Sequence, residues 1–238
     1  MADRRAPATQ ARPSEAVYRT LRTRIITGEL PPGQPLNERA SAVAFGLGLS
    51  PVRDTLTRLV GDGLVQVVAP HAYRITPLTL KSVNDLFTVW TLVGPEMAAL
   101  GTSRADPKQA AQLRQLMMDG NALLAGPLDR DGVVRFIDIT EETFDLVASA
   151  ADNDRLMEVY RSLSCELWRV LTLILISADC VDTLRAAGVT WHSAIDRRDT
   201  LGVMRLTRQI AGATRASALR LLTDRTKSGD GVVIPLRR

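Results

Sequence analysis

Apolar side chains recur at helical spacing along most of this chain of 238 residues. Near its start, Val17, Leu21 and Ile25 follow one another every four residues and so lie on one face of a helix. The turn-forming residues 28–33 end that helix. A second helix is predicted next, with Asn37 as its N-cap. Its inner face is expected to carry Ala40, Val43 and Ala44.

A third helix is predicted after a glycine-rich turn at residues 46–48. Ser50 is expected to cap this helix, and Pro51 is expected to occupy its first position. Arg53 and Thr57 lie one turn apart on the same face and point outward. The opposite face is apolar and carries Val52, Leu56, Leu59 and Val60.

A short β-ribbon is predicted behind the third helix. Gly63 suits the left-handed position past the helix end. Residues 65–67 and 74–76 carry β-forming side chains on either side of a tip at 70–73. Residues 77–80 have the composition of a linker. Helices followed by a ribbon in this order predict a winged helix-turn-helix, an architecture that binds DNA.

Beyond residue 80 the pattern is helical throughout. One apolar stripe runs from Val83 to Leu100 and is interrupted by Gly94 and Pro95, which predicts a kink. Strand signals are absent from this part of the sequence, so we expect an antiparallel helical bundle. Its further helices are predicted at residues 110–124, 133–150, 155–176, 182–187 and 201–222.

These patterns divide the chain into four parts. Residues 1–12 lack apolar periodicity and are expected to be a disordered basic arm. The winged helix-turn-helix domain covers 13–77 and the helical domain 81–224. Residues 225–238 are expected to be a flexible tail. The predicted fold class is therefore mainly α, with one small β-ribbon.

The positive charge of the chain is concentrated in its first part. Residues 1–80 hold 10 Lys and Arg against 6 Asp and Glu, whereas residues 81–238 hold 20 against 20. The formal net charge of +4 thus belongs to the segment with the ribbon, as in a polyanion-binding module joined to a neutral one. Four charges also fall within ordinary scatter, so charge alone does not decide the function.

The composition also bears on the compartment. No apolar run approaches the roughly 20 residues that a membrane span needs, and no apolar stretch follows Arg4 and Arg5 as in a secretory signal. Two cysteines, Cys165 and Cys180, do not make a disulfide framework. We expect a cytoplasmic protein with reduced thiols and no membrane partner.

The outward face of the third helix is the predicted DNA contact. A helix N-terminus favours phosphate, and an arginine side chain can fork onto O6 and N7 of guanine. Arg53 is the leading candidate for base contact, with Thr57 one turn further on. The alternative for any single arginine is a solvated surface side chain. Further DNA contacts are expected from Arg39, Ser50, His71 and Ala72.

Several motifs in order resemble the GntR family of bacterial transcription regulators. They are LR-x-x-I-x-x-G-x-L-x-PG at 21–33, PVR-x-x-L at 51–56 and RL-x-x-x-GLV at 58–65. The resemblance implies a DNA-binding winged helix over 14–77. Two departures concern DNA contact. Leu49 stands where the family usually has an arginine that contacts DNA, and Ala72 replaces the usual wing glycine.

The second part of the chain resembles the FadR-type ligand-sensing domain of that family, the FCD domain. The motif FDLVASAADNDRL at 144–156 carries the resemblance, with a weaker one at 194–199. It implies a bundle of six or seven helices that senses a small-molecule effector. Many members bind a divalent metal through one Asp and three His. The corresponding residues here are Glu141, Asp145, Gly188 and Ile210.

The metal site of the relatives cannot form in this chain, because its only histidines are His71 and His192. We therefore predict no metal and no cofactor. The acidic stripe Asp138, Glu141 and Asp145 would offer oxygen ligands to a hard cation. A solvated acidic face is the interpretation that we favour.

Candidate effector contacts come from the tryptophans and from the former metal positions. Trp90 occupies a place where the family often has arginine, and Gly94 one where it often has glutamate. These changes predict a less polar pocket than that of a carboxylate-sensing relative. The candidate residues are Trp90, Glu141, Asp145, Trp168 and His192. For the two tryptophans the alternative is ordinary core packing, and for His192 it is a packed or surface histidine; we favour these alternatives.

The sequence thus predicts a DNA-binding transcription regulator of the repressor type. We expect it to bind an inverted-repeat operator in double-stranded DNA as a homodimer, with an affinity that the effector changes. The alternative is a ligand-binding or interaction module of the same fold with weak or non-specific DNA binding. The sequence holds no P-loop, no G-x-G-x-x-G after a strand and no G-x-S-x-G, so we do not expect an enzyme.

Overall fold

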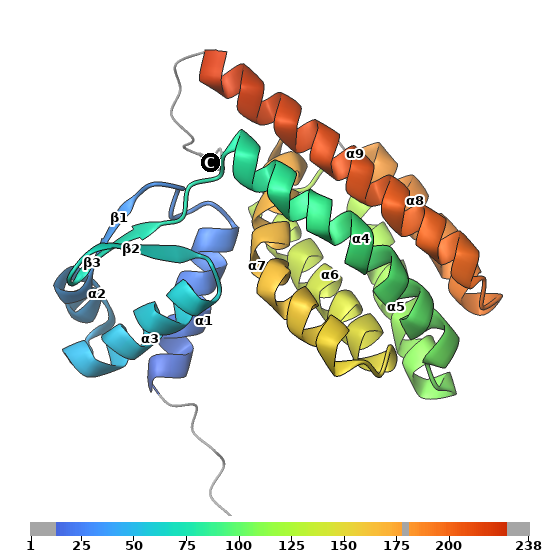
Figure 1. Cartoon of the computed structure of the whole chain (residues 1–238), viewed down its shortest axis with the longest axis horizontal. Helices are drawn as coiled ribbons and strands as arrows, with labels where there is room; N and C mark the ends of the chain where they lie inside the picture. The colour runs from blue at the N-terminus through green and yellow to red at the C-terminus, as the bar shows by residue number, and fades with distance from the viewer. Residues whose placement is uncertain (1–12, 178–180, 228–238) are drawn as a thin grey trace, which may run out of the picture.

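The computed structural model describes residues 13–177 and 181–227 of the chain. A smaller N-terminal domain lies beside a larger helical bundle (Figure 1). The predicted arm over 1–12 lies outside the described residues, as do Cys180 and residues 228–238. The last helix continues to Lys227, so the first residues of the predicted tail are helical.

The N-terminal domain contains the predicted helices and ribbon, together with one strand that the sequence pattern did not predict. The strands form an antiparallel sheet in the order β1-β3-β2, in which Leu36 of β1 and Val67 of β2 both pair with Tyr73 of β3. The elements are α1 (Pro13–Ile26), β1 (Pro35–Asn37), α2 (Glu38–Phe45), α3 (Leu49–Gly61), β2 (Val65–Ala69) and β3 (Ala72–Ile75).

The apolar faces of α1 and α3 meet in the core of this domain. The predicted inner residues of α1 are buried, and Val52, Leu56 and Leu59 of α3 have no exposed surface. Burying one such side chain contributes about 1.5–3 kcal/mol, so this interface is a main source of the domain's stability. Gly63 has a φ of 71°, the left-handed conformation predicted for the position past the end of α3.

The predicted orientation of α2 is wrong. Ala40, Val43 and Ala44 are exposed, with Val43 at 83%. The helix instead buries Glu38 and Ala42. Its N-cap is Asn37, as predicted, because the side chain accepts hydrogen bonds from the backbone N–H groups of the first turn.

The predicted cap of α3 is also wrong. The helix begins at Leu49 behind Gly48, so Ser50 lies inside its first turn. The N-cap position is occupied by Gly48, which makes no side-chain cap hydrogen bond to the N–H groups there. That turn therefore keeps the backbone donors that a capping serine would have occupied.

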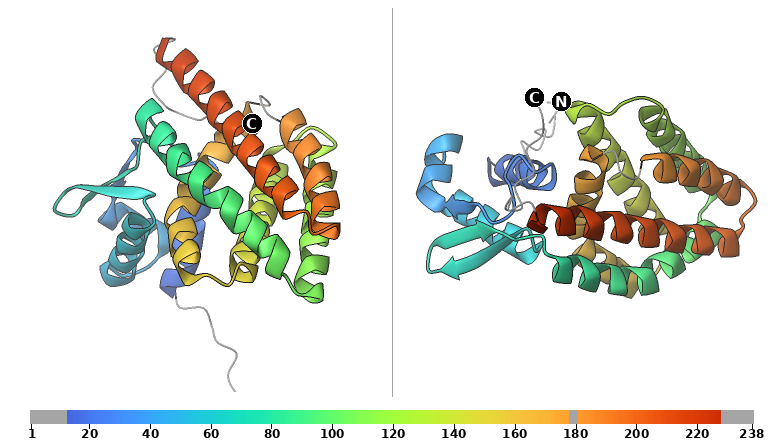
Figure 2. Two further views of the ribbon diagram at one scale, coloured as in Figure 1. Left: turned by 45° about the vertical axis from the view of Figure 1, so that its right-hand side comes forward. Right: turned by 90° about the horizontal axis from the view of Figure 1, so that it is seen from above.

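The second domain is an all-helical bundle in the described residues, as predicted. Helices α4 and α9 lie side by side along most of their length, and α7 lies on the side of the N-terminal domain (Figures 1 and 2). Pro95 lies inside α4 without ending it. The helices are α4 (Leu80–Arg104), α5 (Pro107–Leu124), α6 (Arg130–Ala150), α7 (Asp154–Ile176), α8 (Val181–Asp196) and α9 (Thr200–Lys227).

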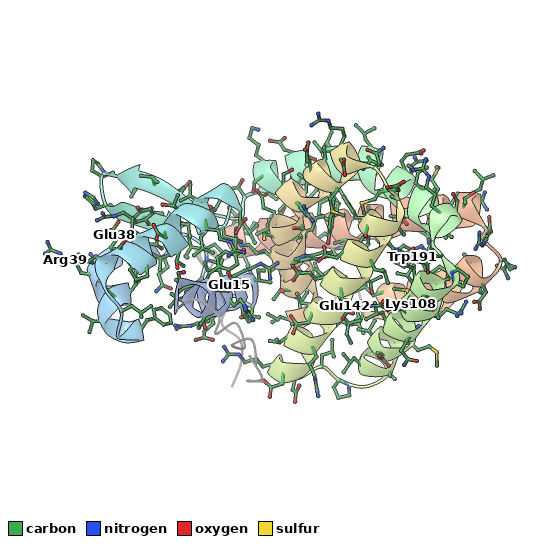
Figure 3. All side chains as sticks on the ribbon, turned by 90° about the horizontal axis from the view of Figure 1, so that it is seen from below. Glu15, Glu38, Arg39, Lys108, Glu142 and Trp191 are labelled. Atoms are coloured by element: carbon green, nitrogen blue, oxygen red, sulfur yellow. The ribbon has the colours of Figure 1, made fainter. Side chains whose placement is uncertain are left out.

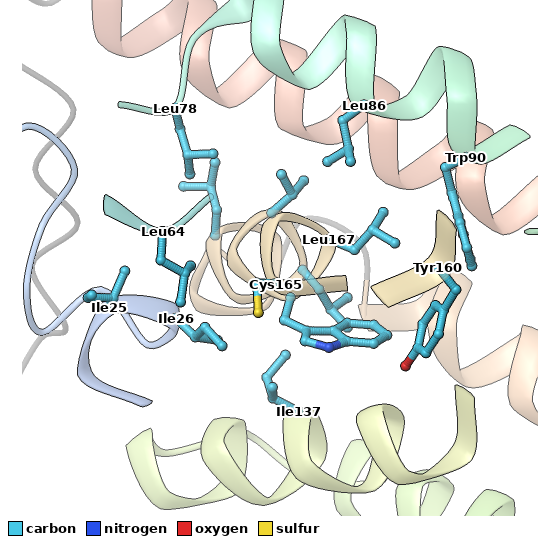
Figure 4. Close-up of a cluster of buried hydrophobic side chains, with 14 of the residues drawn as sticks. Ile25, Ile26, Leu64, Leu78, Leu86, Trp90, Ile137, Tyr160, Cys165 and Leu167 are labelled. Carbon is cyan, nitrogen blue, oxygen red and sulfur yellow. The ribbon is translucent and has the colours of Figure 1, made fainter. Parts of the chain in front are cut away.

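The two domains share one hydrophobic core. Ile26 of α1, Leu64 behind α3 and Cys165 of α7 belong to the same buried cluster (Figure 4). Leu78 of the linker is buried as well. The N-terminal domain is therefore packed against the bundle and not merely tethered to it. Across the described part of the chain, no helix has the length and apolarity required to cross a bilayer.

Candidate DNA interface and effector cavity

The first turns of α3 form an exposed surface with the properties of a DNA contact. Leu49, Ser50, Arg53 and Thr57 are all exposed on it. The uncapped N–H groups of the helix start belong to the same surface, and such groups bind phosphate oxygens. Helix α3 thus brings backbone donors and an arginine to one face.

Arg53 is held in place by Glu38 of α2. Its Nε donates to Oε1 of Glu38 at 3.2 Å, and its Nη2 donates to Oε2 at 3.1 Å. These two donors form the side face of the guanidinium group. The end of the fork, where Nη1 and Nη2 each present a further N–H, is not used by Glu38. That end has the geometry for a bidentate contact with guanine.

Only 5% of the surface of Glu38 is exposed, and its side chain connects α2 with α3 and β3. The hydroxyl of Tyr73 donates to its Oε1 at 3.2 Å, and Nδ1 of His71 lies 3.5 Å from the same oxygen. The hydrogen bond from Arg53 lowers the pKa of Glu38, which keeps the carboxylate ionised at neutral pH. Sequence reasoning missed this residue because a glutamate in the first turn of a helix is usually solvated.

The tip of the wing is formed by His71. This residue has a φ of 61°, in the left-handed region that favours glycine, whereas Ala72 already belongs to β3. The replacement of the wing glycine by Ala72 therefore does not place an alanine at the left-handed position. Arg39 is exposed on α2 and points away from the domain at its outer end (Figure 3).

Two side chains that the sequence linked to the effector are bound to other partners. Glu141 of α6 forms an ion pair with Arg22 of α1, across the boundary between the domains. Asp145 accepts a hydrogen bond of 2.7 Å from the hydroxyl of Tyr160. Neither lines the cavity of the bundle. Asp138, the third acidic residue of the stripe, is exposed, and no metal-binding group of three acidic, histidine or cysteine side chains occurs among the described residues.

A second polar contact joins the bundle to the end of the wing. Nη2 of Arg169, on α7, donates to the backbone oxygen of Thr76 at 2.5 Å. Arg169 is almost completely buried, and this burial lowers its pKa to about 10. Helix α7 is thus attached to the residue that directly follows the wing strand β3.

The bundle contains a cavity of about 140 Å³. Trp90 and Trp168, two of the candidate effector residues, line it, and Trp191 of α8 lines it too. Phe144 lies among these indoles, with ring centroids 5.6, 5.7 and 5.5 Å from Trp90, Trp168 and Trp191. His192 lies on α8, and its side chain is outside the described part of the structure. The cavity therefore has an aromatic wall.

Comparison with known proteins matches both domains to family models. Residues 13–74 match the model described as "Bacterial regulatory proteins, gntR family", and residues 85–213 match the FCD domain. The FCD match alone covers more than half of the chain.

Individual relatives agree with these matches. The chain is 22% identical over 195 residues to the HTH-type transcriptional repressor RspR of Escherichia coli, covering 80% of this chain and 84% of RspR. It is 33% identical to the regulator YdhC of Bacillus subtilis over 72 residues, 30% of this chain and 32% of YdhC. The solved structure of E. coli McbR/YncC has the same fold, with a TM-score of 0.73 at 18% identity, covering 89% of this chain and 99% of that one.

Proposed function

We propose that this chain, which belongs to the GntR family of bacterial regulatory proteins and carries an FCD domain, represses transcription by binding an operator through α3 and the wing. Members of this family are DNA-binding transcription regulators with a ligand-sensing domain, and they are not enzymes. The observation that carries the proposal is the arginine of α3, which Glu38 holds by its side face. We assign DNA binding to residues 13–77, and effector binding and dimerisation to residues 81–224. Because a bacterial operator lies in the cytoplasm, the protein works there.

The DNA contacts divide into base and backbone contacts. Arg53 binds a guanine in the major groove with the end of its fork, and Thr57 contacts the next base edge. The N–H groups at the start of α3 bind a phosphate, together with the hydroxyl of Ser50. Further backbone or minor-groove contacts come from Arg39 on α2 and from His71 and Ala72 at the wing.

The operator is an inverted repeat bound by a homodimer. One winged helix contacts few base pairs, whereas two copies related by a two-fold axis contact two half-sites. The exposed apolar part of α4 supports a dimer contact. Leu92 is 74% exposed, and Val89, three residues earlier, lies on the same side of the helix and is also exposed.

The effector acts through α6 and α7, which both line the cavity and contact the DNA-binding domain. On α6, Thr140 and Phe144 line the cavity, and Glu141 binds Arg22. On α7, Trp168 lines the cavity, and Arg169 binds the backbone oxygen of Thr76 behind the wing. A ligand that shifts either helix changes the position of the winged helix, and with it the spacing of the two recognition helices.

The test is a fluorescence-anisotropy titration of DNA fragments that flank the gene of this protein, with random DNA as competitor. Wild type is expected to select one fragment, and Arg53→Ala to reduce that selectivity about ten- to hundredfold. Arg155→Ala removes an equally charged, exposed side chain at the far end of α7 and is expected to leave selectivity unchanged.

A lack of selectivity in the same titration would support a second candidate function, a ligand-binding or interaction module of the same fold. Leu49 is exposed at the start of α3, where relatives usually have a DNA-contacting arginine, and this favours weak or non-specific binding. Equal binding of all fragments by wild type and by Arg53→Ala would replace the regulator with a ligand-binding or interaction module of the same fold.

A further inference from the structure

The cavity in the bundle has a wall without charge. Among the described residues that line it, none is Asp, Glu, Lys, Arg or His. Aromatic and aliphatic side chains make up most of the wall, and the polar groups are threonine hydroxyls and the amide of Asn121. A carboxylate placed here would lose its hydration without gaining a cationic partner, which is strongly unfavourable.

The volume of the cavity limits the size of its ligand. An engineered protein cavity of about 150 Å³ with an apolar wall stays dry and binds benzene. The cavity here, at about 140 Å³, is of the same size. It therefore fits a single aromatic ring, which would pack against Phe144 and the surrounding indoles.

The threonine hydroxyls of the wall are acceptors. Thr140 donates its hydrogen to the backbone oxygen of Phe136 at 2.7 Å, and Thr143 donates to that of Ile139 at 2.7 Å. Thr207 donates to Val203 in the same manner, at 2.9 Å. Because a hydroxyl has only one hydrogen, these oxygens can only accept a further bond. A ligand that meets them must bring a donor.

The indoles contribute apolar surface to the wall. The Nε1 atoms of Trp168 and Trp191 have almost no accessible surface, so a ligand in the cavity does not reach them. The threonines therefore set the polar requirement, and one hydroxyl group on the ring meets it.

We propose that the effector is an uncharged hydroxyaromatic compound with a single ring, of the phenol class. This assignment rests on the proposed function in one respect, since it takes the cavity to be the effector site. The ring packs against the aromatic wall, and the hydroxyl group donates to a threonine oxygen.

The chain provides its own reporter for this ligand. All three of its tryptophans, Trp90, Trp168 and Trp191, line the cavity, so tryptophan emission reports on the cavity wall without DNA. The probes are phenol, toluene and benzoate, which share one ring and differ in the substituent. Phenol is expected to bind at least tenfold more tightly than benzoate and several-fold more tightly than toluene.

Three variants separate specific binding from adsorption. Thr140→Val with Thr143→Val removes two of the threonine acceptors at nearly constant shape, so the preference for phenol over toluene should shrink. Ala211→Leu fills the cavity and should weaken phenol and toluene alike. Thr172→Val removes a buried hydroxyl on α7 that is not part of the cavity wall, and should change neither. Benzoate binding as tightly as phenol, or a phenol affinity that is the same in all variants, overturns the proposal.

The same titration repeated on the DNA complex separates this proposal from the proposed function. Phenol that binds with the expected preference but does not change DNA affinity leaves the ligand class intact and contradicts effector control. Selective DNA binding together with a cavity that prefers benzoate contradicts the ligand class and leaves the regulator intact.

Discussion

Glu38 binds the side face of Arg53 with both carboxylate oxygens, 3.2 Å from Nε and 3.1 Å from Nη2. The carboxylate is buried and ionised, while the guanidinium group is about half exposed. A bidentate charge-assisted pair fixes the plane of the guanidinium group as well as its position. The end of the fork is thereby oriented before DNA arrives, which reduces the ordering cost of binding.

Glu38→Gln is therefore expected to reduce sequence selectivity. Glutamine offers one acceptor where the carboxylate offers two, so the side chain of Arg53 becomes free to rotate. Selectivity for the operator over random DNA should fall about tenfold, as for the loss of one bidentate base contact. Non-specific affinity should hold or rise slightly, because a negative charge is removed next to DNA. Anisotropy titrations of both DNAs measure the two effects.

Tyr73→Phe provides the matched control for this substitution. It removes the hydrogen bond that Tyr73 donates to Glu38 but leaves both bonds between Glu38 and Arg53 in place. Selectivity should therefore stay within about threefold of wild type. Full selectivity in Glu38→Gln would mean that Arg53 is oriented by DNA and not by Glu38.

Glu141→Gln should weaken the attachment of the N-terminal domain to the bundle. The side chains of Arg22 and Glu141 are 17% and 27% exposed, so their pair is mostly buried. Loss of one partner from a fully buried pair costs about 3–5 kcal/mol, and partial solvent screening here reduces that to about 2 kcal/mol. Urea denaturation monitored by circular dichroism measures the change in the free energy of unfolding.

The neighbouring residue Glu142 gives the control for this change. It is exposed, and within the described part of the chain it accepts a hydrogen bond from Gln112 of the same domain, so Glu142→Gln should change stability by less than about 0.5 kcal/mol. The double variant Arg22→Glu with Glu141→Arg exchanges the two charges and should recover part of the stability that Glu141→Gln loses. Equal effects of the two glutamine variants would show that the pair contributes nothing beyond a surface contact.

Leu92→Asp should prevent dimerisation if α4 forms the contact between copies. A charge at the centre of an apolar interface is costly to bury, whereas the same residue in the monomer is already 74% exposed. Fold stability should therefore stay unchanged while sedimentation equilibrium shows a monomer. Leu201→Asp alters an exposed leucine at the start of α9 and is expected to leave the dimer intact. A dimer that persists in Leu92→Asp would exclude this face.

The parts of the fold that followed from the sequence are those with a strong local signal. The apolar face of α3 and the glycine behind it were predicted because each residue meets a requirement of the helix itself. The orientation of α2 does not follow from its apolar residues, because the helix buries Glu38 together with Ala42. The partners of Glu38, Arg53 and Tyr73, come from distant positions.

The candidate effector residues also differ in whether a local pattern determines where their side chains lie. Trp90 and Trp168 line the cavity, since large apolar side chains on the inner faces of a bundle have few other places to lie. Glu141 and Asp145 stand at two metal positions of the relatives. Without a metal, each has a protein partner, and no local pattern specifies a partner on another element.

Trp90 and Gly94, the two departures from the family on α4, depend on each other. A Cβ at residue 94 would lie 2.7 Å from Cε2 and Cζ2 of Trp90, so the indole fills the space of a side chain there. Gly94→Ala must displace the ring, and such overpacking costs about 1–3 kcal/mol. Because Trp90 lines the cavity, phenol affinity and tryptophan emission should change together with stability.

Gly120→Ala separates this effect from the general consequence of adding a methyl group to a helix. Gly120 lines the same cavity, but a Cβ there would lie 3.6 Å from Ile139 and Phe136, an ordinary contact. Alanine is favoured over glycine in a helix by about 0.8–1 kcal/mol, so this variant should gain stability where Gly94→Ala loses it. In a Trp90→Leu background the clash is absent. Adding Gly94→Ala to that variant should therefore cost no packing energy relative to Trp90→Leu alone. If Gly94→Ala is as stable as Gly120→Ala in thermal denaturation, the indole can move without cost, and Trp90 does not define the cavity wall.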